Sequence, residues 1–183
     1  GARRLTLLAM NDTGYKNLLV LLSLGRTKGQ KAGYALLTWN WIMSYAEGLI
    51  CLSGATEGEI GQLAIAGQFD KADAALARYI ELFKDRFYFE LTRLGFFGET
   101  KLMQYAIRAE SRIPISFVAT NIACFATSDD FEAHKARVCI HEGVTLDDKR
   151  RLHNYSPEQW LKPSSDMVEL FSDFPDAIDN TVA

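Results

Sequence analysis

The sequence is poor in the residues that build disulfide frameworks and metal sites. It holds three cysteines and three histidines in 183 residues. The cysteines, Cys51, Cys124 and Cys139, include no CxxC pair. An odd number of widely spaced cysteines argues against a disulfide framework and is typical of reduced thiols in the cytoplasm. We therefore expect a cytoplasmic protein.

Long apolar runs and clustered positive charge are also missing. No apolar stretch approaches the roughly 18 residues of a membrane span, and the apolar run in the opening GARRLTLLAM is too short for a secretory signal. The net charge of −3 argues against direct binding of a nucleic-acid backbone. A hydrophobic content of 48% is nevertheless enough for one sizeable core.

The common catalytic motifs are absent as well. Neither of the glycine-rich phosphate loops, GxGxxG and GxxxxGK[ST], occurs. His134 and His141 lie seven residues apart, whereas a metal pair on a helix prefers the i, i+4 spacing of HExxH. Residue chemistry alone therefore indicates no catalytic constellation.

What the sequence does contain is an alternation of strand-like and helix-like segments. Apolar runs predict strands at residues 5–9, 49–53, 87–91 and 115–119. Helical periodicity and capping residues predict helices at 15–24, 38–47, 57–66, 70–83, 99–112 and 131–140, and helix starts at 156–159 and 164–166. This order favours right-handed βα units in a mostly parallel sheet or barrel.

The stretch 115–140 occupies the position where a parallel α/β fold gathers functional side chains. In such folds, the residues just past a strand's carboxyl end converge on a ligand. Here those residues are Ile122, Ala123 and Cys124, which offer little for acid–base or metal chemistry. Cys124 could act as a nucleophile or soft ligand, but we favour a buried free thiol.

The histidines have ordinary structural interpretations. We interpret His134 as a helix or core histidine rather than a metal ligand. His141 and His153 are expected to be exposed loop residues.

The carboxylates also have plain explanations. The adjacent Asp147 and Asp148 could bind a cation, but such pairs usually cap a turn or face solvent. Glu57 and Glu59 open a helix, where the positive end of the helix dipole favours acidic residues whatever the function.

Several blocks of the sequence, taken together, resemble one known family. The blocks are RLTLLAMNDTGYKNL, EGLICLSGATEGEIG, DRFYFELTRLG, FVATNIACF, DFEAHKARVCI, TLDD, NYSPEQWLK and ELFSDFPDAIDNT. Their order and spacing resemble the PHP (polymerase and histidinol phosphatase) domain of bacterial replicative DNA polymerase III alpha subunits. The resemblance extends over essentially the whole chain.

The resemblance implies a fold and a parent chain. The expected fold is α/β, with parallel βα units that form most of a distorted (β/α)7 barrel. Residues 1–141 would belong to the barrel, and residues 142–183 would form a helical C-terminal extension leading toward the polymerase core. The chain would begin inside the domain, without the family's first strands and their HxH motif. The parent would be a DNA-directed DNA polymerase that uses Mg²⁺ in a polymerase site outside this segment.

The resemblance also implies a degenerate metal site. Active members hold a multinuclear metal centre that activates water for phosphoester cleavage. Four ligand positions of that pattern fall on Arg4, Ala55, Ile122 and Cys124, where the family has His, Cys, Asp and His. Arg, Ala and Ile cannot ligate a cation, so only Cys124 retains a donor. We expect no metal, no cofactor and no catalytic residue in this segment.

The resemblance further implies a docking role. Members that lost the metal centre carry the proofreading exonuclease (epsilon) subunit and support the rest of the polymerase alpha chain, which binds DNA through other domains. The alternative is an active PHP exonuclease or phosphoesterase that uses ligands from the missing N-terminal part together with Cys124 and Glu90 or His134. A stand-alone α/β domain of unrelated role is a third possibility. Phe96, Phe97 and Trp160 are candidate anchors for a partner, but such aromatics are equally often ordinary loop packing, so none is assigned to an interface.

Overall fold

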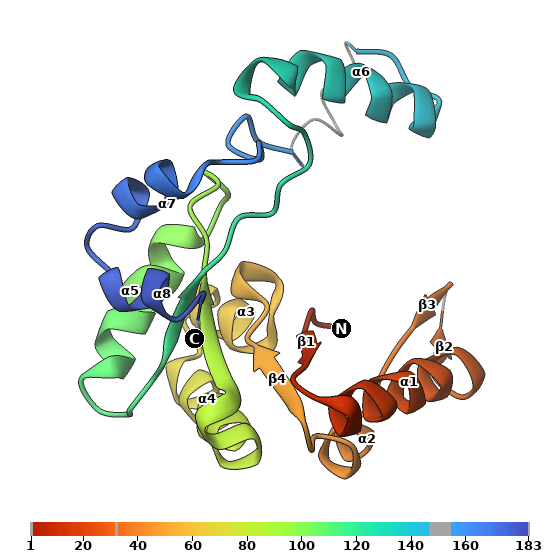
Figure 1. The fold of residues 1–183 in the computed structure, drawn as a ribbon, viewed down its shortest axis with the longest axis vertical. Helices are drawn as coiled ribbons and strands as arrows, with labels where there is room; N and C mark the ends of the chain where they lie inside the picture. Colours follow the sequence, from red (N-terminus) through yellow and green to blue (C-terminus); the bar gives the residue numbers. More distant parts are fainter. Residues whose placement is uncertain (1, 32, 147–154, 183) are drawn as a thin grey trace. The chain divides into compact units, whose positions relative to one another are not determined.

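Helices and strands alternate along most of the chain (Figure 1). The computed structural model describes residues 2–31, 33–146 and 155–182. The strands are β1 (Thr6–Ala9), β2 (Gln30–Lys31), β3 (Tyr34–Ala35), β4 (Leu49–Leu52), β5 (Phe87–Leu91) and β6 (Phe117–Ala119). The α-helices are α1 (Asp12–Thr27), α2 (Trp39–Ser44), α3 (Glu59–Ile65), α4 (Phe69–Phe83), α5 (Glu99–Glu110), α6 (Phe131–Glu142), α7 (Ser164–Leu170) and α8 (Pro175–Asp179). The 3₁₀ helices are η1 (Ala55–Glu57), η2 (Lys84–Arg86) and η3 (Ser128–Asp130).

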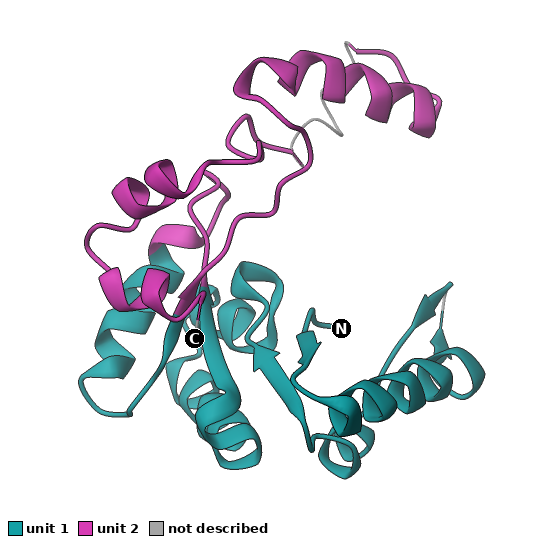
Figure 2. Ribbon diagram, viewed as in Figure 1, with its two compact units in different colours: residues 1–90, 101–117 teal, residues 91–100, 118–183 magenta. Residues whose placement is uncertain are grey.

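The chain divides into two compact units (Figure 2). Unit 1 consists of Gly1–Glu90 and Lys101–Phe117, and unit 2 consists of Leu91–Thr100 and Val118–Ala183. The predicted division at residue 142 concerns parts of a family domain and stays a prediction.

The main sheet has the strand order β1-β4-β5-β6. β4 pairs in parallel with β5, with Cys51 opposite Phe87. β1 instead pairs antiparallel with β4, with Thr6 opposite Leu52. The predicted mixed α/β class is therefore confirmed, but the first strand departs from the expected parallel arrangement. Among the described residues the sheet is open, and the predicted (β/α)7 barrel is not formed.

Two glycines explain the antiparallel start of the sheet. The N–H of Met10, just after β1, donates to the carbonyl of Gly48, just before β4, at 2.9 Å. Gly48 has φ +70°, and a Cβ on Gly14 would lie 1.8 Å from the Gly48 oxygen. Because glycine has no side chain at either position, the end of β1 can lie close to the beginning of β4.

The core of unit 1 lies between the sheet and the helices α2, α3 and α4. The Tyr79 ring stacks on Phe87 with 5.6 Å between centroids and meets Trp39 edge-on at 4.9 Å. Arg78 pairs with Glu59 at 2.7 Å and so links α4 to α3. Of the apolar positions predicted to face inward on α4, Ile80 is half-buried and the others are buried: Ala72, Leu76, Tyr79 and Phe83. The 3.6-residue periodicity therefore identified the core face of this helix correctly.

Unit 2 is organised around Arg93. Its guanidinium pairs with Asp173 at 2.6 Å, donates to the carbonyl of Leu170 and lies 5.0 Å from the centroid of Phe171, which is fully buried. These contacts join the segment that follows β5 to α7 and α8. Pro175 occupies the first turn of α8, where its fixed φ and missing N–H suit the start of a helix.

Three sequence predictions about local structure are wrong. α1 continues through Gly25, which was expected to end it, because Gly25 lies against Leu37 and Ala35 where a Cβ would be 3.3 Å and 3.5 Å away. The segment 26–31, expected to be a polar loop, includes β2, which pairs with β3 as a hairpin. The segment 156–159 is a turn rather than a helix start, since the Gln159 side chain accepts the N–H of Ser156 at 2.9 Å.

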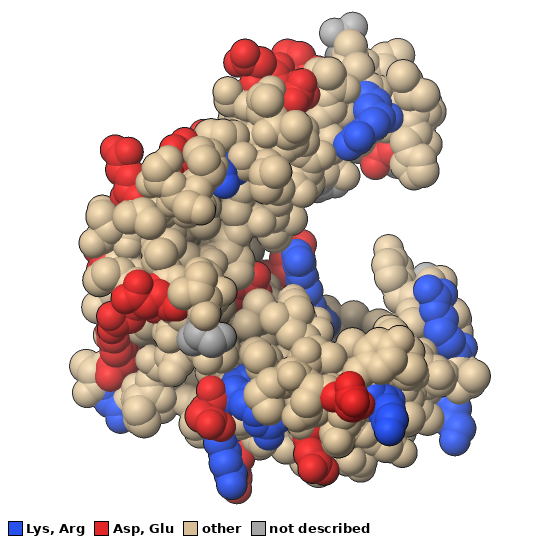
Figure 3. All heavy atoms as spheres, in the orientation of Figure 1, with Lys and Arg blue, Asp and Glu red and all other residues tan. Residues whose placement is uncertain are grey.

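Charge and hydropathy follow the expected distribution. In the described ranges, none of the helices combines the length and the apolar character that crossing a bilayer requires. On the face drawn in Figure 3, the Lys and Arg side chains are scattered among acidic ones rather than gathered into one basic stripe.

Candidate functional site

The loop that follows β4 holds Ala55, one of the four predicted ligand positions. Gly54 has φ +82° and Ala55 has φ +46°, an unusual conformation for a residue with a Cβ. Ala55 is 6% exposed. A methyl group in this tight turn offers no donor to a cation.

Arg4 lies directly against this loop. Its backbone N–H donates to the carbonyl of Glu57 at 3.1 Å, and its Nη1 lies 3.1 Å from Glu57 Oε2. Arg4 also forms an isolated β-bridge with Gly58. Unit 1 therefore brings Arg4 and the Ala55 loop together, and Glu57, expected only to open a helix, anchors the guanidinium.

Glu90 on β5 is the buried carboxylate of this region. It is 4% exposed, its Oε2 accepts the N–H of Gly54 at 3.1 Å, and its own N–H donates to Ser53 Oγ at 2.9 Å. Burial, and next the negative charge of Glu90, raise the pKa of the neighbouring Cys51 thiol above its usual range. Cys51 is therefore a protonated core residue, and Glu90 holds the loop to the sheet.

The other two ligand positions, Ile122 and Cys124, lie together in unit 2. The N–H of Cys124 donates to the carbonyl of Gln159 at 2.7 Å. The Gln159 side-chain nitrogen lies 3.5 Å from Cys124 Sγ and 3.4 Å from the carbonyl of Ile122. Both residues are half-buried, so Cys124 is less enclosed than expected. Nothing in the local sequence pattern identified the role of Gln159.

His134 is a core histidine, as predicted. It is 6% exposed, and its ring contacts Tyr155 and Phe125 with centroid distances of 4.6 Å and 5.3 Å. Arg137 Nη2 lies 3.0 Å from Nδ1, so Nδ1 is the acceptor and Nε2 carries the proton. Nε2 is buried without a hydrogen-bond partner among the described residues. Burial, and next the charge of Arg137, lower the pKa of His134 from 6.5.

Of the remaining titratable candidates, His141 and Glu59 lie in described helices. His141 is exposed, but it belongs to the last turn of α6 rather than to a loop. His153, Asp147 and Asp148 lie outside the described residues. Glu59 opens α3 as predicted and pairs with Arg78.

The predicted ligand positions form two pairs in different units, each described by itself. Arg4 accompanies Ala55 in unit 1, and Ile122 accompanies Cys124 in unit 2. Within the described ranges, no three His, Cys, Asp or Glu side chains are grouped as a metal site requires. Of the four predicted positions only Cys124 has an atom that could ligate a cation, and Glu90 is a buried carboxylate near the pair in unit 1. The expectation that the segment binds no metal stays a prediction.

A second feature missed by sequence reasoning is the clamp formed by Glu99. Its carboxylate accepts the Thr92 hydroxyl at 2.7 Å and the N–H groups of Leu94 and Gly95 at 3.0 Å and 2.9 Å. The loop between β5 and α5 is therefore held by one side chain. A carboxylate at a helix start just after a glycine-containing loop is the signal that could have indicated it.

The candidate aromatic anchors differ in their exposure. Phe97 lies in the loop between β5 and α5 and is 84% exposed, whereas Phe96 and Trp160 are half-buried. Of these three residues, Phe97 is therefore the one most available to a partner.

Comparison with known proteins relates this arrangement to one family. The profile of the PHP domain matches residues 1–94. A DNA polymerase III subunit alpha from Pseudomonas aeruginosa is 47% identical over 179 residues, which cover 98% of this chain and 15% of that protein. Those from Vibrio cholerae and Escherichia coli are each 41% identical, over 98% and 97% of this chain and 15% of the relative. The chain thus spans about 15% of the length of these curated relatives.

Proposed function

The chain belongs to the PHP domain family, and on this premise we propose that it is the PHP segment of a DNA polymerase III alpha subunit. In that subunit it acts as a non-catalytic structural and docking domain. The parent chain carries out DNA-directed DNA synthesis in the cytoplasm, with Mg²⁺ in a polymerase site outside this segment. The open sheet would be completed toward a PHP barrel by residues outside this segment.

The observation that carries the proposal is the pairing of Arg4 with the Ala55 loop. The Arg4 guanidinium pairs with Glu57 at 3.1 Å and has no lone pair to offer a cation, and the adjacent Ala55 is a buried methyl group. A divalent cation therefore gains no ligand atom from either side chain. Two of the four positions at which an active relative needs ligands therefore work against metal binding.

The proposed partners are the proofreading exonuclease (epsilon) subunit and the rest of the alpha chain. Membership of the family and similarity to alpha subunits support this assignment. A docking role also agrees with the rigid loop that presents Phe97, since aromatic side chains on preorganised loops are effective anchors.

A direct test uses the full-length chain. Purified alone and supplied with Mn²⁺ or Zn²⁺, it should show no 3′-exonuclease or phosphoesterase activity above a protein-free blank. The same preparation should bind the purified exonuclease subunit at one to one. Nuclease activity that disappears in both Glu90→Gln and Cys124→Ser would contradict the proposal and favour an active metal-dependent phosphoesterase.

A further inference from the structure

One stretch of unit 1 carries positive charge without any acidic residue. Residues 13–46 contain Lys16, Arg26, Lys28 and Lys31 and no Asp or Glu, so their net charge is +4 although that of the whole chain is −3. All four cationic side chains are exposed, and among the described residues none of them takes part in an ion pair. The net charge of the chain therefore hides a local basic region.

Three of these cations gather at one end of α1. Arg26 lies in its last turn, Lys28 is its C-cap and Lys31 ends β2. Because the chain between the first and the last of them extends over about 18 Å at most, the three charges match the length of about five phosphates on one DNA strand. We call these three cations, together with the β2–β3 hairpin, the basic hairpin. On the face drawn in Figure 3, the hairpin end of unit 1 shows Lys and Arg side chains and no acidic ones.

The hairpin places a cation and an aromatic ring on one face. Lys31 lies directly opposite Tyr34 in the antiparallel register, and directly opposite side chains share a face of a two-stranded ribbon. Tyr34 is 72% exposed. The dipole of α1 favours cations at its C-terminal end whatever the function, which accounts for Arg26 and Lys28, but this effect is confined to the last turn. The exposed pair on the hairpin therefore needs another explanation.

The basic hairpin is held firmly against α1. The N–H of Leu36, just after β3, donates to the carbonyl of Gly29 at 2.9 Å. The N–H groups of Lys28 and Gly29 both donate to the carbonyl of Leu24, at 2.8 Å and 3.0 Å. A Cβ on Gly29 would lie 1.9 Å from the Leu36 oxygen, so glycine is what permits this close approach. Charges on such a preorganised support lose little conformational freedom when they bind.

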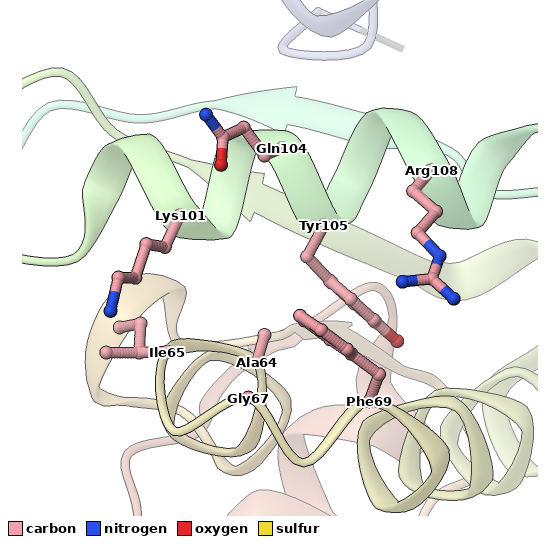
Figure 4. A pocket seen from close by; sticks show the side chains of 8 residues that line it. All are labelled: Ala64, Ile65, Gly67, Phe69, Lys101, Gln104, Tyr105 and Arg108. Carbon is pink, nitrogen blue, oxygen red and sulfur yellow. The ribbon is translucent and has the colours of Figure 1, made fainter.

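The charges of the basic hairpin differ from those on α5 in having no carboxylate beside them among the described residues. α1 packs mainly against β1, β4 and the hairpin, and these strands contain no Asp or Glu. On α5, by contrast, both cations drawn in Figure 4 are engaged. Arg108 lies 5.1 Å from the centroid of Phe69 and acts electrostatically on Asp73, and Lys101 has an interaction of its own. The basic hairpin is therefore the better candidate for a polyanionic ligand.

We infer that the basic hairpin binds the phosphate backbone of duplex DNA. Arg26, Lys28 and Lys31 would pair with phosphates of one strand, and Tyr34 would contact the same backbone through its hydroxyl and ring. A ribbon that projects from the end of a helix (Figure 1) suits the surface of a duplex, whereas a peptide side chain is better held in a concave apolar pocket. The inference goes beyond the proposed docking function and presupposes the proposed polymerase, whose full-length chain binds DNA.

The first test is the salt dependence of primed-DNA binding by the full-length chain. Each phosphate contact contributes about 0.9 to the slope of log affinity against log salt concentration. The hairpin variant Lys28→Ala/Lys31→Ala should therefore reduce the slope by about 1.8 and weaken binding about tenfold or more at about 50 mM salt. Its matched control, Lys16→Ala/Lys71→Ala, removes two exposed lysines of unit 1 outside the basic hairpin and should leave the slope unchanged. Tyr34→Ala should weaken binding without changing the slope, because it removes no charge.

A second measurement locates the contact on the full-length chain. Primed DNA should protect Lys28 and Lys31 from chemical acetylation, while Lys16 and Lys71 should keep their reactivity. If Lys28 and Lys31 are already unreactive before DNA is added, another part of the chain covers the basic hairpin and the inference is overturned.

The outcomes separate this inference from the proposed function. If the original chain and the hairpin variant bind primed DNA with the same slope, the inference is overturned while the proposed function stands. If the hairpin variant binds DNA normally but loses affinity for the exonuclease subunit, the basic hairpin contacts protein and the inference is wrong. If the original chain binds no primed DNA, the proposed polymerase and the inference both fail.

Discussion

The carboxylate of Glu90 and the backbone of Gly54 are joined by a buried hydrogen bond of 3.1 Å. The Glu90 N–H returns the link by donating to Ser53 Oγ at 2.9 Å. These two bonds attach the loop that carries Ala55 to the central strand of the sheet. Glu90 Oε2 thus serves as a structural acceptor for the loop that carries Ala55.

Removing that carboxylate should loosen the loop. In Glu90→Ala the Gly54 N–H would be buried without this acceptor, which costs about 1–3 kcal/mol. Hydrogen exchange measured on peptides covering residues 53–58 of the full-length chain should accelerate accordingly. Glu90→Gln retains an acceptor and should change exchange far less. Equal exchange in Glu90→Ala and the original chain would show that the bond does not hold the loop.

Gly54 should be much less tolerant of alanine than Gly67. Both have positive φ, +82° and +73°, so each Ala variant incurs about 1–2 kcal/mol of left-handed strain. Only at Gly54 would the new Cβ also lie 2.4 Å from the Arg4 carbonyl oxygen. Thermal unfolding of the two variants should therefore differ, with Gly54→Ala the less stable. Equal melting temperatures would mean that the Arg4 segment does not pack against the loop.

Arg93 should control the stability of the C-terminal helices. Arg93→Ala removes the ion pair with Asp173, the hydrogen bond to Leu170 and the contact with the Phe171 ring. The local opening free energy of α7 and α8 should fall by about 1–3 kcal/mol, as measured by hydrogen exchange. Arg93→Lys retains the charge but not the forked geometry and should give an intermediate loss. Unchanged exchange in Arg93→Ala would contradict this assignment.

The environment of His134 predicts a pH dependence of α6. Its pKa is lowered from 6.5 by burial and by Arg137. The unfolded state therefore binds the proton more readily, so the stabilisation is complete above pH 6.5 and is lost as the pH falls through the lower folded pKa. Hydrogen exchange of residues 131–142 should accelerate between pH 7.5 and pH 5.5 beyond the intrinsic chemical effect. His134→Phe, which keeps a ring between Phe125 and Tyr155, should abolish the excess.

The elements with strong local signals were predictable from sequence. The apolar run of β5 matched its observed bounds, and the periodicity of α4 and α5 identified their buried faces. Gly25 shows why other boundaries were not. Glycine often ends a helix, but here it permits the close approach of Leu37 and Ala35. That contact depends on the β2–β3 hairpin, and the sequence pattern of α1 does not indicate it. The antiparallel pairing of β1 likewise depends on Gly14 meeting Gly48 across the fold.

The contacts around the candidate site were not predictable from the sequence, and the assignment of its residues stays a prediction. The resemblance located Arg4 and Ala55, and the structure adds the Glu57 ion pair that fixes the guanidinium. Gln159, which bridges Ile122 and Cys124, lies 35 residues beyond Cys124 in the sequence and carries no recognisable motif. The stacking of Phe69 on Tyr105 was not predictable for the same reason, since the two rings meet only through packing.

The account's central claim is that the metal centre of active relatives is lost, and the metal content of the full-length chain tests it most directly. Zinc, manganese and iron should be measured by elemental analysis after purification without chelator, beside the variant Arg4→His/Ala55→Cys/Ile122→Asp/Cys124→His. We predict less than about a tenth of an equivalent in the original chain and a clear gain in the variant, because only the variant supplies donor side chains at all four positions. A full equivalent or more in the original chain would contradict the claim and make the metal-dependent phosphoesterase the better account.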